Sequence, residues 1–263
     1  MRAKSSMRKG YTNRLKSQVF YPQIQSFLHL SCSISTCGIE WESMQTEDIL
    51  NELHRHADKK YAAFAQKLIP GEERILGVRL PRLRALAKKE ARENRTKLLE
   101  EPLPHGAPFE LRMLRGMLPG YVCGLSPEEC IRCIEKELPH LNNWSLCDSC
   151  CATYHFARRE RTAVWAWLQT LLSRRKEFYT RFVLVMLLNH FLQEESWSER
   201  CAKLLADISP LGYYDAMASA WCACEIILRH PSQASFLLAP HTLSPVILKL
   251  THKKLRESRR TWS

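Results

Sequence analysis

The chain has 263 residues, 45% of them apolar, which is enough to bury a sizeable core as one large domain or two small ones. It contains no stretch of about 20 apolar residues, so the sequence predicts no membrane span. Its net charge of +12 favours a polyanionic partner, nucleic acid being the commonest, over a basic surface that binds nothing.

Residues 1–43 differ from the rest of the chain. They are rich in serine, lack helical periodicity and carry six basic and two acidic residues, so the remainder of the chain carries a charge of +8. We expect a basic leader that is either disordered or the product of an upstream start codon. One domain over residues 44–263 follows, and Thr46 is the predicted N-cap of its first helix.

From Met44 onward the sequence is typical of one amphipathic helix after another. Glycine is sparse, and no segment alternates cleanly between apolar and polar residues, which favours helix over strand. Ser126-Pro127-Glu128-Glu129 combines an N-cap, a proline at the first helical position and acids in the first turn. The predicted helices cover 46–58, 60–68, 81–93, 107–123, 126–138, 143–157, 159–173, 176–192, 196–206, 212–229 and 244–257.

Short links between these helices predict an all-α fold with antiparallel packing. Helix pairs recur roughly every 35–40 residues, a period typical of HEAT-like repeats. Because literal similarity between the repeats is weak, periodicity alone supports an α-solenoid and an irregular bundle about equally.

The cysteines lie mostly inside apolar helical patterns, which indicates reduced, buried thiols in a cytoplasmic protein. Examples are Cys123, Cys147, Cys201 and Cys222. Two pairs, Cys130-x2-Cys133 and Cys147-x2-Cys150, have the spacing of a structural zinc site. Residues i and i+3 of a helix share a face in any case, and no glycine-rich knuckle surrounds either pair. We therefore predict no bound metal.

Several short segments occur in a characteristic order. They are Lys59-Lys60-Tyr61-Ala62-Ala63-Phe64, Ile75-Leu76-Gly77-Val78-Arg79-Leu80-Pro81, Phe109-Glu110-Leu111-Arg112-Met113-Leu114-Arg115-Gly116, Asn143-Trp144-Ser145-Leu146-Cys147-Asp148-Ser149, and Gly212-Tyr213-Tyr214 through Trp221. Together they resemble the AlkD-type DNA alkylation repair family over about residues 44–260. The resemblance implies a superhelix of antiparallel HEAT-like helix pairs, an α-solenoid, with a concave basic face.

The same resemblance implies an activity. It points to a monofunctional glycosylase that excises cationic N3- or N7-alkylated purines from double-stranded DNA, without a cofactor and without strand cleavage. We expect such a protein to be a monomer in the cytoplasm. In a bacterium, it would at most be associated with the nucleoid. Two alternatives stay open: a non-catalytic nucleic-acid binder with the same basic face, and a helical-repeat scaffold for proteins.

Trp144 and Asp148 stand four residues apart, so on a helix they share a face, with Cβ atoms roughly 5–6 Å apart. A preceding Asn142 or Asn143 is suited to cap that helix. An alkylated purine already carries positive charge and can leave as a neutral base. The deoxyribose then becomes oxocarbenium-like, and a carboxylate with an aromatic face stabilises such a cation.

The resemblance assigns roles to further positions. Asp148 matches the catalytic carboxylate, Trp144 and Trp221 match aromatic residues that contact the deoxyribose, and Arg181 matches an arginine that holds the DNA backbone. Each residue also has an ordinary alternative: the tryptophans as packing residues, Asp148 as a cap or ion-pair partner, Arg181 as a helix-end charge. The other candidates for DNA contact are Phe64, Arg79, Arg82, Lys88, Lys253 and Arg259.

Two departures from the family pattern bear on DNA contact. The position of Phe64 is often tyrosine in the family, so a hydroxyl is missing there. Asp215-Ala216-Met217 stands where relatives tend to have a lysine, which places an acid near the expected phosphate path.

Overall fold

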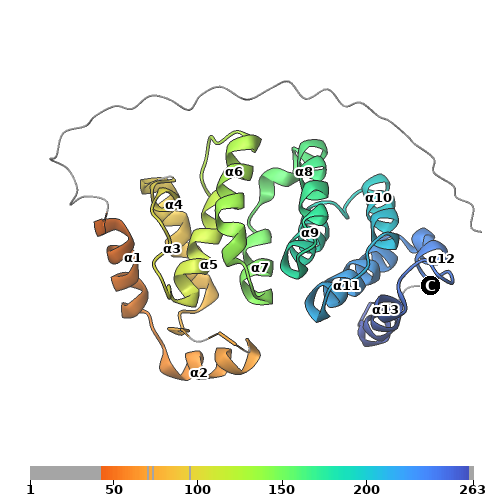
Figure 1. Cartoon of the computed structure of the whole chain (residues 1–263), viewed down its shortest axis with the longest axis horizontal. Helices are drawn as coiled ribbons and strands as arrows, with labels where there is room; N and C mark the ends of the chain where they lie inside the picture. Colours follow the sequence, from red (N-terminus) through yellow and green to blue (C-terminus); the bar gives the residue numbers. More distant parts are fainter. Residues whose placement is uncertain (1–42, 70, 73, 95, 261–263) are drawn as a thin grey trace, which may run out of the picture. The chain divides into compact units, whose positions relative to one another are not determined.

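The computed structural model describes residues 43–69, 71–72, 74–94 and 96–260, and every regular element in these residues is a helix (Figure 1). The all-α prediction is therefore confirmed. The leader predicted for residues 1–43 lies almost entirely outside the described residues. None of the described helices is long and apolar enough to cross a membrane.

Most of the helices form two rows (Figure 1). In the first row each helix packs against the next: α3 (Leu80–Glu93), α5 (Phe109–Met117), α7 (Trp144–Cys151), α9 (Glu177–His190), α11 (Tyr213–Arg229) and α13 (Pro245–Glu257). The second row holds α4 (Lys97–Glu100), α6 (Pro127–Glu137), α8 (Arg161–Ser173), α10 (Glu195–Ala206) and α12 (Ala234–Leu237). This alternation of helices between two rows is that of an α-solenoid.

Two further helices precede the rows. α1 (Ser43–Arg55) packs against α5, and α2 (Lys59–Leu68) follows it after a short turn. Thr46 lies inside α1 and its hydroxyl donates to the Glu101 carboxylate, so the prediction that Thr46 caps the first helix is wrong. Asp58 is the cap that the sequence reading missed, because its carboxylate accepts from the N–H groups of Lys60 and Tyr61 at the start of α2.

In the first row, α9 and α11 run in the same direction. At one end of the α9–α11 pair, the N–H of Tyr214 donates to the Glu177 carboxylate over 2.7 Å. At the other end, Nε2 of His230 lies 3.0 Å from the Leu192 carbonyl oxygen. The N-terminal ends of the two helices are in contact, and so are their C-terminal ends, which means that α9 and α11 are parallel. Side chains in the first turns of these helices consequently come to the same edge of the row.

The segment predicted as one helix over 143–157 is shorter in the structure. α7 ends at Cys151, and the 3₁₀ turn η3 (His155–Arg158) follows. The Thr153 hydroxyl donates to the Cys150 carbonyl oxygen over 2.7 Å, and the Thr153 N–H donates to the same oxygen over 2.9 Å. A side chain that takes a backbone acceptor in this way competes with the helical pattern and ends α7.

The loop before α3 is held from beneath by a buried carboxylate. Glu110 on α5 accepts hydrogen bonds from the N–H groups of Leu76, Gly77 and Val78 over 2.9, 2.7 and 3.2 Å. Gly77 has φ +91, and a Cβ there would lie 2.1 Å from the Asp58 carbonyl oxygen. Only glycine satisfies both requirements, so this loop fixes the start of α2 against the start of α3.

The predicted buried thiols are largely confirmed. Cys147, Cys201 and Cys222 are fully buried, whereas Cys123 lies exposed after the 3₁₀ turn η1 (Leu118–Gly120), so that part of the prediction is wrong. Burial raises the pKa of the Cys201 thiol to about 12. The Cys201 thiol therefore stays protonated at neutral pH, and buried cysteines of this kind pack as small apolar groups.

His190, at the end of α9, is expected to make the protein sensitive to acid. Its Nε2 lies 2.7 Å from the Cys151 carbonyl oxygen, and burial lowers its pKa to about 4 from the usual 6.5. The unfolded chain therefore binds a proton that the folded chain excludes as the pH falls from 6.5 to 4. This group alone should remove about 3 kcal/mol of stability across that window.

The measurement is the free energy of unfolding by urea between pH 7 and pH 4. His190→Gln keeps an N–H donor but does not titrate, so its stability should fall less steeply over this range. A parallel slope in the variant and the original protein would contradict the assignment.

Candidate active site

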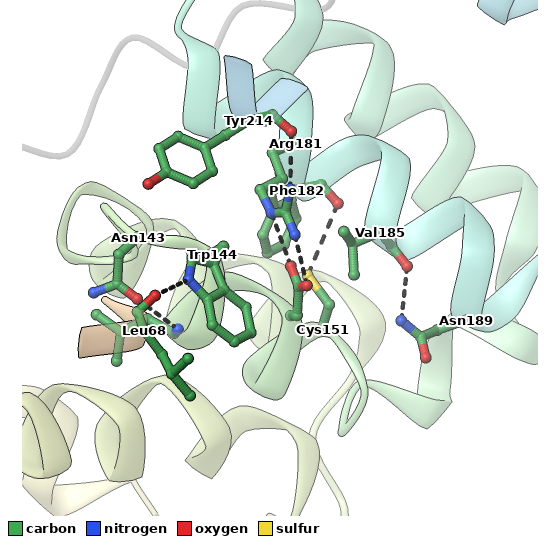
Figure 2. Close-up of polar contacts among 11 residues, drawn as sticks. Leu68, Asn143, Trp144, Cys151, Arg181, Phe182, Val185, Asn189 and Tyr214 are labelled. Atoms are coloured by element: carbon green, nitrogen blue, oxygen red, sulfur yellow. Dashed lines mark hydrogen bonds and ion pairs between the residues drawn. The ribbon is translucent and has the colours of Figure 1, made fainter. Parts of the chain in front are cut away.

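Asp148 and Arg181 form an ion pair between adjacent helices of the first row. Nε of Arg181 donates to Oδ1 of Asp148 over 2.9 Å, and Nη2 donates to Oδ2 over 2.7 Å. Nη1 donates to the Tyr214 carbonyl oxygen over 2.8 Å, which adds α11 to the contact (Figure 2). The Arg181 side chain is 7% exposed and that of Asp148 is 21% exposed. The pair thus fixes the carboxylate while leaving part of it accessible.

Two opposing effects act on the Asp148 carboxyl. Burial raises its pKa and is the larger cause, whereas the hydrogen bonds and the positive charge of Arg181 oppose that rise. A guanidinium stays protonated over the whole pH range of the protein. We therefore expect the carboxylate to be ionised at neutral pH and fixed in orientation.

The indole of Trp144 is tied to α2. Its Nε1 donates to the Leu68 carbonyl oxygen over 3.1 Å (Figure 2). Asn143 caps α7, because its Oδ1 accepts from the Leu146 N–H over 3.0 Å, and its Nδ2 donates to Glu72 over 3.2 Å. Of the two predicted caps, Asn143 is the one in use. The cap and the indole bond together hold the start of α7, one turn before Asp148.

Trp144 also lines a small apolar cavity of about 120 Å³ between α2, α3, α5 and α7. Phe64, predicted to contact DNA, lines the same cavity and is 56% exposed. Tyr61 stacks on Phe64 with ring centroids 6.1 Å apart, and the Arg79 guanidinium lies 4.6 Å from the Tyr61 ring centroid. Tyr61 therefore brings a phenol ring beside Phe64, the position where the family often has tyrosine.

Trp221 lies on α11 and is 38% exposed, so it is available for contact. It stands two turns beyond Tyr214, whose carbonyl binds Arg181. Asp215 is fully buried and accepts from the N–H groups of Leu211 and Gly212 over 2.7 and 2.9 Å. It caps α11 internally, which corrects the expectation that it places an acid on the phosphate path.

The remaining predicted cations lie on α3 and α13 or next to them, away from the Asp148 pair in the chain. Arg82 donates to Glu52 over 2.8 Å, Lys88 lies 5.4 Å from the Tyr121 ring centroid, and Lys253 is 3.8 Å from Glu257. Arg79 lies 3.5 Å from Asp58, and Arg259 is exposed. The structure therefore brings Asp148 and Arg181 together, and Phe64 near Trp144, while a continuous basic face stays a prediction.

The cysteine pairs with zinc-like spacing lie in helices. Cys147 and Cys150 are fully buried in α7, and burial raises the pKa of Cys130 in α6 to about 11. Within the described ranges, no group of three or more His, Cys, Asp or Glu side chains is arranged to hold a metal ion.

Some contacts at the site were not predicted from the sequence. Tyr214 and Leu68 contribute backbone carbonyls, which leave no side-chain signature. Glu177 accepts from the Tyr214 N–H, and the only available signal was its place in the first turn of a helix.

Comparison with known proteins assigns the chain to a family. The family model for DNA alkylation repair enzymes matches residues 49–210, a range that contains Trp144, Asp148 and Arg181 and stops before α11. No curated protein and no solved structure gives a significant match. Because the family match covers more than half of the chain, the protein belongs to the DNA alkylation repair enzyme family, which supports a role in DNA repair and an interaction with DNA.

Proposed function

We propose that the protein is a monofunctional DNA glycosylase that hydrolyses the N-glycosidic bond of cationic N3- or N7-alkylated purines in double-stranded DNA. The observation that carries the proposal is the Asp148 carboxylate. It is partly accessible, fixed by two hydrogen bonds from a buried arginine, and one helical turn from the Trp144 indole.

The reaction places its electrostatic demand on the sugar. The bond between C1′ and the purine nitrogen breaks, and its electron pair leaves with the base, which becomes neutral. Positive charge develops on the deoxyribose, and a water molecule then adds to C1′ and loses a proton. A fixed carboxylate stabilises that charge and orients the water. Aromatic faces such as those of Trp144 and Trp221 contribute about 0.5–2 kcal/mol per contact to a cation.

Arg181 acts in this proposal as a positioning residue. Three of its N–H groups are engaged by Asp148 and Tyr214, and its side chain is almost fully buried. Its main task is to hold Asp148 and the start of α11 in register. The DNA backbone contact predicted for Arg181 would then have to be made by its remaining N–H groups.

The test is release of free base from duplex DNA that contains N7-methylguanine or N3-methyladenine. We expect free base and alkali-labile abasic sites, without strand breaks before alkali treatment. Asp148→Asn is the inactive reference, and Asp48→Asn, an exposed acid on α1, is the matched control that should keep activity. Release no faster than in the Asp148→Asn variant would refute the proposal.

A second candidate is a DNA binder without turnover. The observation in its favour is that Asp148 and Arg181 satisfy each other, as in a structural ion pair. This candidate predicts salt-dependent DNA binding that survives Asp148→Asn, together with no base release by the original protein.

A further inference from the structure

Three aromatic side chains gather where α9 and α11 begin. The rings of Phe178 and Tyr214 have centroids 5.2 Å apart, and those of Tyr213 and Tyr214 are 5.4 Å apart at an interplanar angle of 78°. Phe178 and Tyr214 are partly buried, whereas Tyr213 is 64% exposed. We call Phe178, Tyr213 and Tyr214 the aromatic rim. Tyr213 is its projecting member.

The backbone beneath the aromatic rim is fixed. The N–H groups of Leu211 and Gly212 donate to Asp215, and the N–H of Tyr214 donates to Glu177. A Cβ at Gly212 would lie 2.3 Å from the Glu177 carboxylate, so the chain packs closely there. Tyr213 therefore projects from a rigid support, and a ligand would lose little by ordering it.

Near the aromatic rim, a phosphate could be bound by backbone N–H groups or by basic side chains, and the structure favours the side chains. Asp215 accepts from the N–H groups of Leu211 and Gly212, and Glu177 accepts from that of Tyr214, so these three groups are not open to a phosphate. Arg175 and Lys176, in the turn before α9, are exposed, and neither forms an ion pair with a carboxylate in the part of the chain that the structure describes. Lys176 lies over the Tyr179 ring, 4.9 Å from its centroid, so its ammonium has no carboxylate partner that would compete with a phosphate. Cations of this kind bind the phosphates of a nucleic-acid strand, and a projecting aromatic ring stacks on an exposed nucleobase.

The aromatic rim is joined to the proposed active site. The Tyr214 carbonyl accepts from Arg181, which in turn holds Asp148. The Cys151 carbonyl at the end of α7 lies beside His190 at the end of α9, so α7 runs parallel to α9 and α11. Tyr214 of the rim therefore lies at the same edge of the row as Trp144, which begins α7 (Figure 2). A DNA strand whose deoxyribose reaches Asp148 would bring a neighbouring nucleotide to Tyr213.

We propose that Tyr213 stacks on the nucleobase face that becomes exposed beside the nucleotide at Asp148 once that nucleotide has lost its base, with Arg175 and Lys176 binding the adjoining phosphates. The proposal rests on the DNA contact contained in the proposed function, but it does not require turnover. It adds a site on α11, beyond the residues that match the family model.

Photocrosslinking tests the stacking directly. A duplex carries a tetrahydrofuran abasic analogue, with 5-iododeoxyuridine placed in turn at each position within two nucleotides of it on both strands. The full chain is irradiated with each duplex, and crosslinked peptides are mapped by mass spectrometry. We expect one or two positions beside the analogue to crosslink to Tyr213.

Variants give a second readout. Tyr213→Ala should weaken binding of the analogue duplex about 5- to 100-fold, and Tyr213→Phe should restore it, because a stacking contact needs the ring and not the hydroxyl. Phe236→Ala on α12, another exposed aromatic, is the control that should leave binding unchanged. Replacing Arg175 and Lys176 with Gln should reduce the salt dependence by about one to two phosphate contacts.

The outcomes separate the two proposals. Crosslinks to Tyr213 without base release would overturn the glycosylase alone. Base release together with full DNA affinity in Tyr213→Ala and crosslinks that map elsewhere would overturn the role of the aromatic rim alone. A nuclease-resistant protein complex that depends on Tyr213, with DNA binding unchanged, would also overturn it by showing that the rim binds protein.

Discussion

Replacing Asp148 with asparagine is expected to slow base release by about 100- to 1,000-fold, the range seen when one fixed electrostatic contact is removed from a transition state. Asparagine has nearly the same shape and can still accept from Arg181, so the fold should persist. It lacks the negative charge that, in the proposed reaction, stabilises the developing deoxyribose cation. Single-turnover rates with N7-methylguanine DNA measure the effect, and affinity for an abasic-analogue duplex should change little.

The role of Arg181 can be separated from that of Asp148 by the pH profile. Arg181→Met removes the groups that oppose the burial-driven rise in the Asp148 pKa, so this pKa should rise further. In the proposed reaction the carboxylate acts in its ionised form, so the acidic limb of the base-release rate should move to higher pH. Arg181→Lys should move the limb back part of the way. A variant that loses activity with an unmoved limb would indicate a purely structural arginine.

Breaking the buried pair between α5 and α6 is expected to produce the largest loss of stability. Arg115 donates to the Glu137 carboxylate over 2.8 Å, and its Nη1 donates to the Glu101 carbonyl oxygen over 2.9 Å. The two charged side chains are only 3% and 2% exposed. Glu137→Gln leaves the guanidinium buried without a counter-charge, which should lower the free energy of unfolding by about 3–5 kcal/mol.

Urea unfolding at pH 7 measures this loss. Replacing both partners, Arg115→Met with Glu137→Leu, removes both desolvation penalties, so the double variant should be clearly more stable than Glu137→Gln. Glu199→Gln is the matched exposed control. It breaks a pair with Lys203 on α10 and should change stability by no more than about 1 kcal/mol. Equal losses for the buried and the exposed pair would contradict the prediction.

The helical order of the chain could be predicted from the sequence because its signals are local. Ser126 caps α6, as the pattern indicated, and it forms a capping box with Glu129. Thr46 shows the limit, because its hydroxyl finds Glu101, 55 positions along the chain. Very short helices such as α4 and α12 were missed, because four residues are too few for a periodicity to show.

For the candidate site, the sequence predicted the identity of the residues but not the contacts between them. Spacing alone placed Trp144 and Asp148 on one face of α7. That Arg181 would hold Asp148 rather than face outward depends on the packing of α7 against α9. The burial of Asp215 was likewise invisible, since an acid in a first turn is usually exposed and here is enclosed by the chain before α11.

Arg181 on α9 contacts both neighbouring helices of the first row, α7 and α11, and this has a consequence for cooperativity. In a linear array of repeats each unit is coupled mainly to its neighbours, so the C-terminal units can open while the rest stays folded. Opening of α11 would release the bond between Arg181 and the Tyr214 carbonyl and loosen Asp148 at the same time. The position of Asp148 in the middle of the array would then be only as well fixed as the last repeats are stable, and these repeats lie beyond the segment matched by the family.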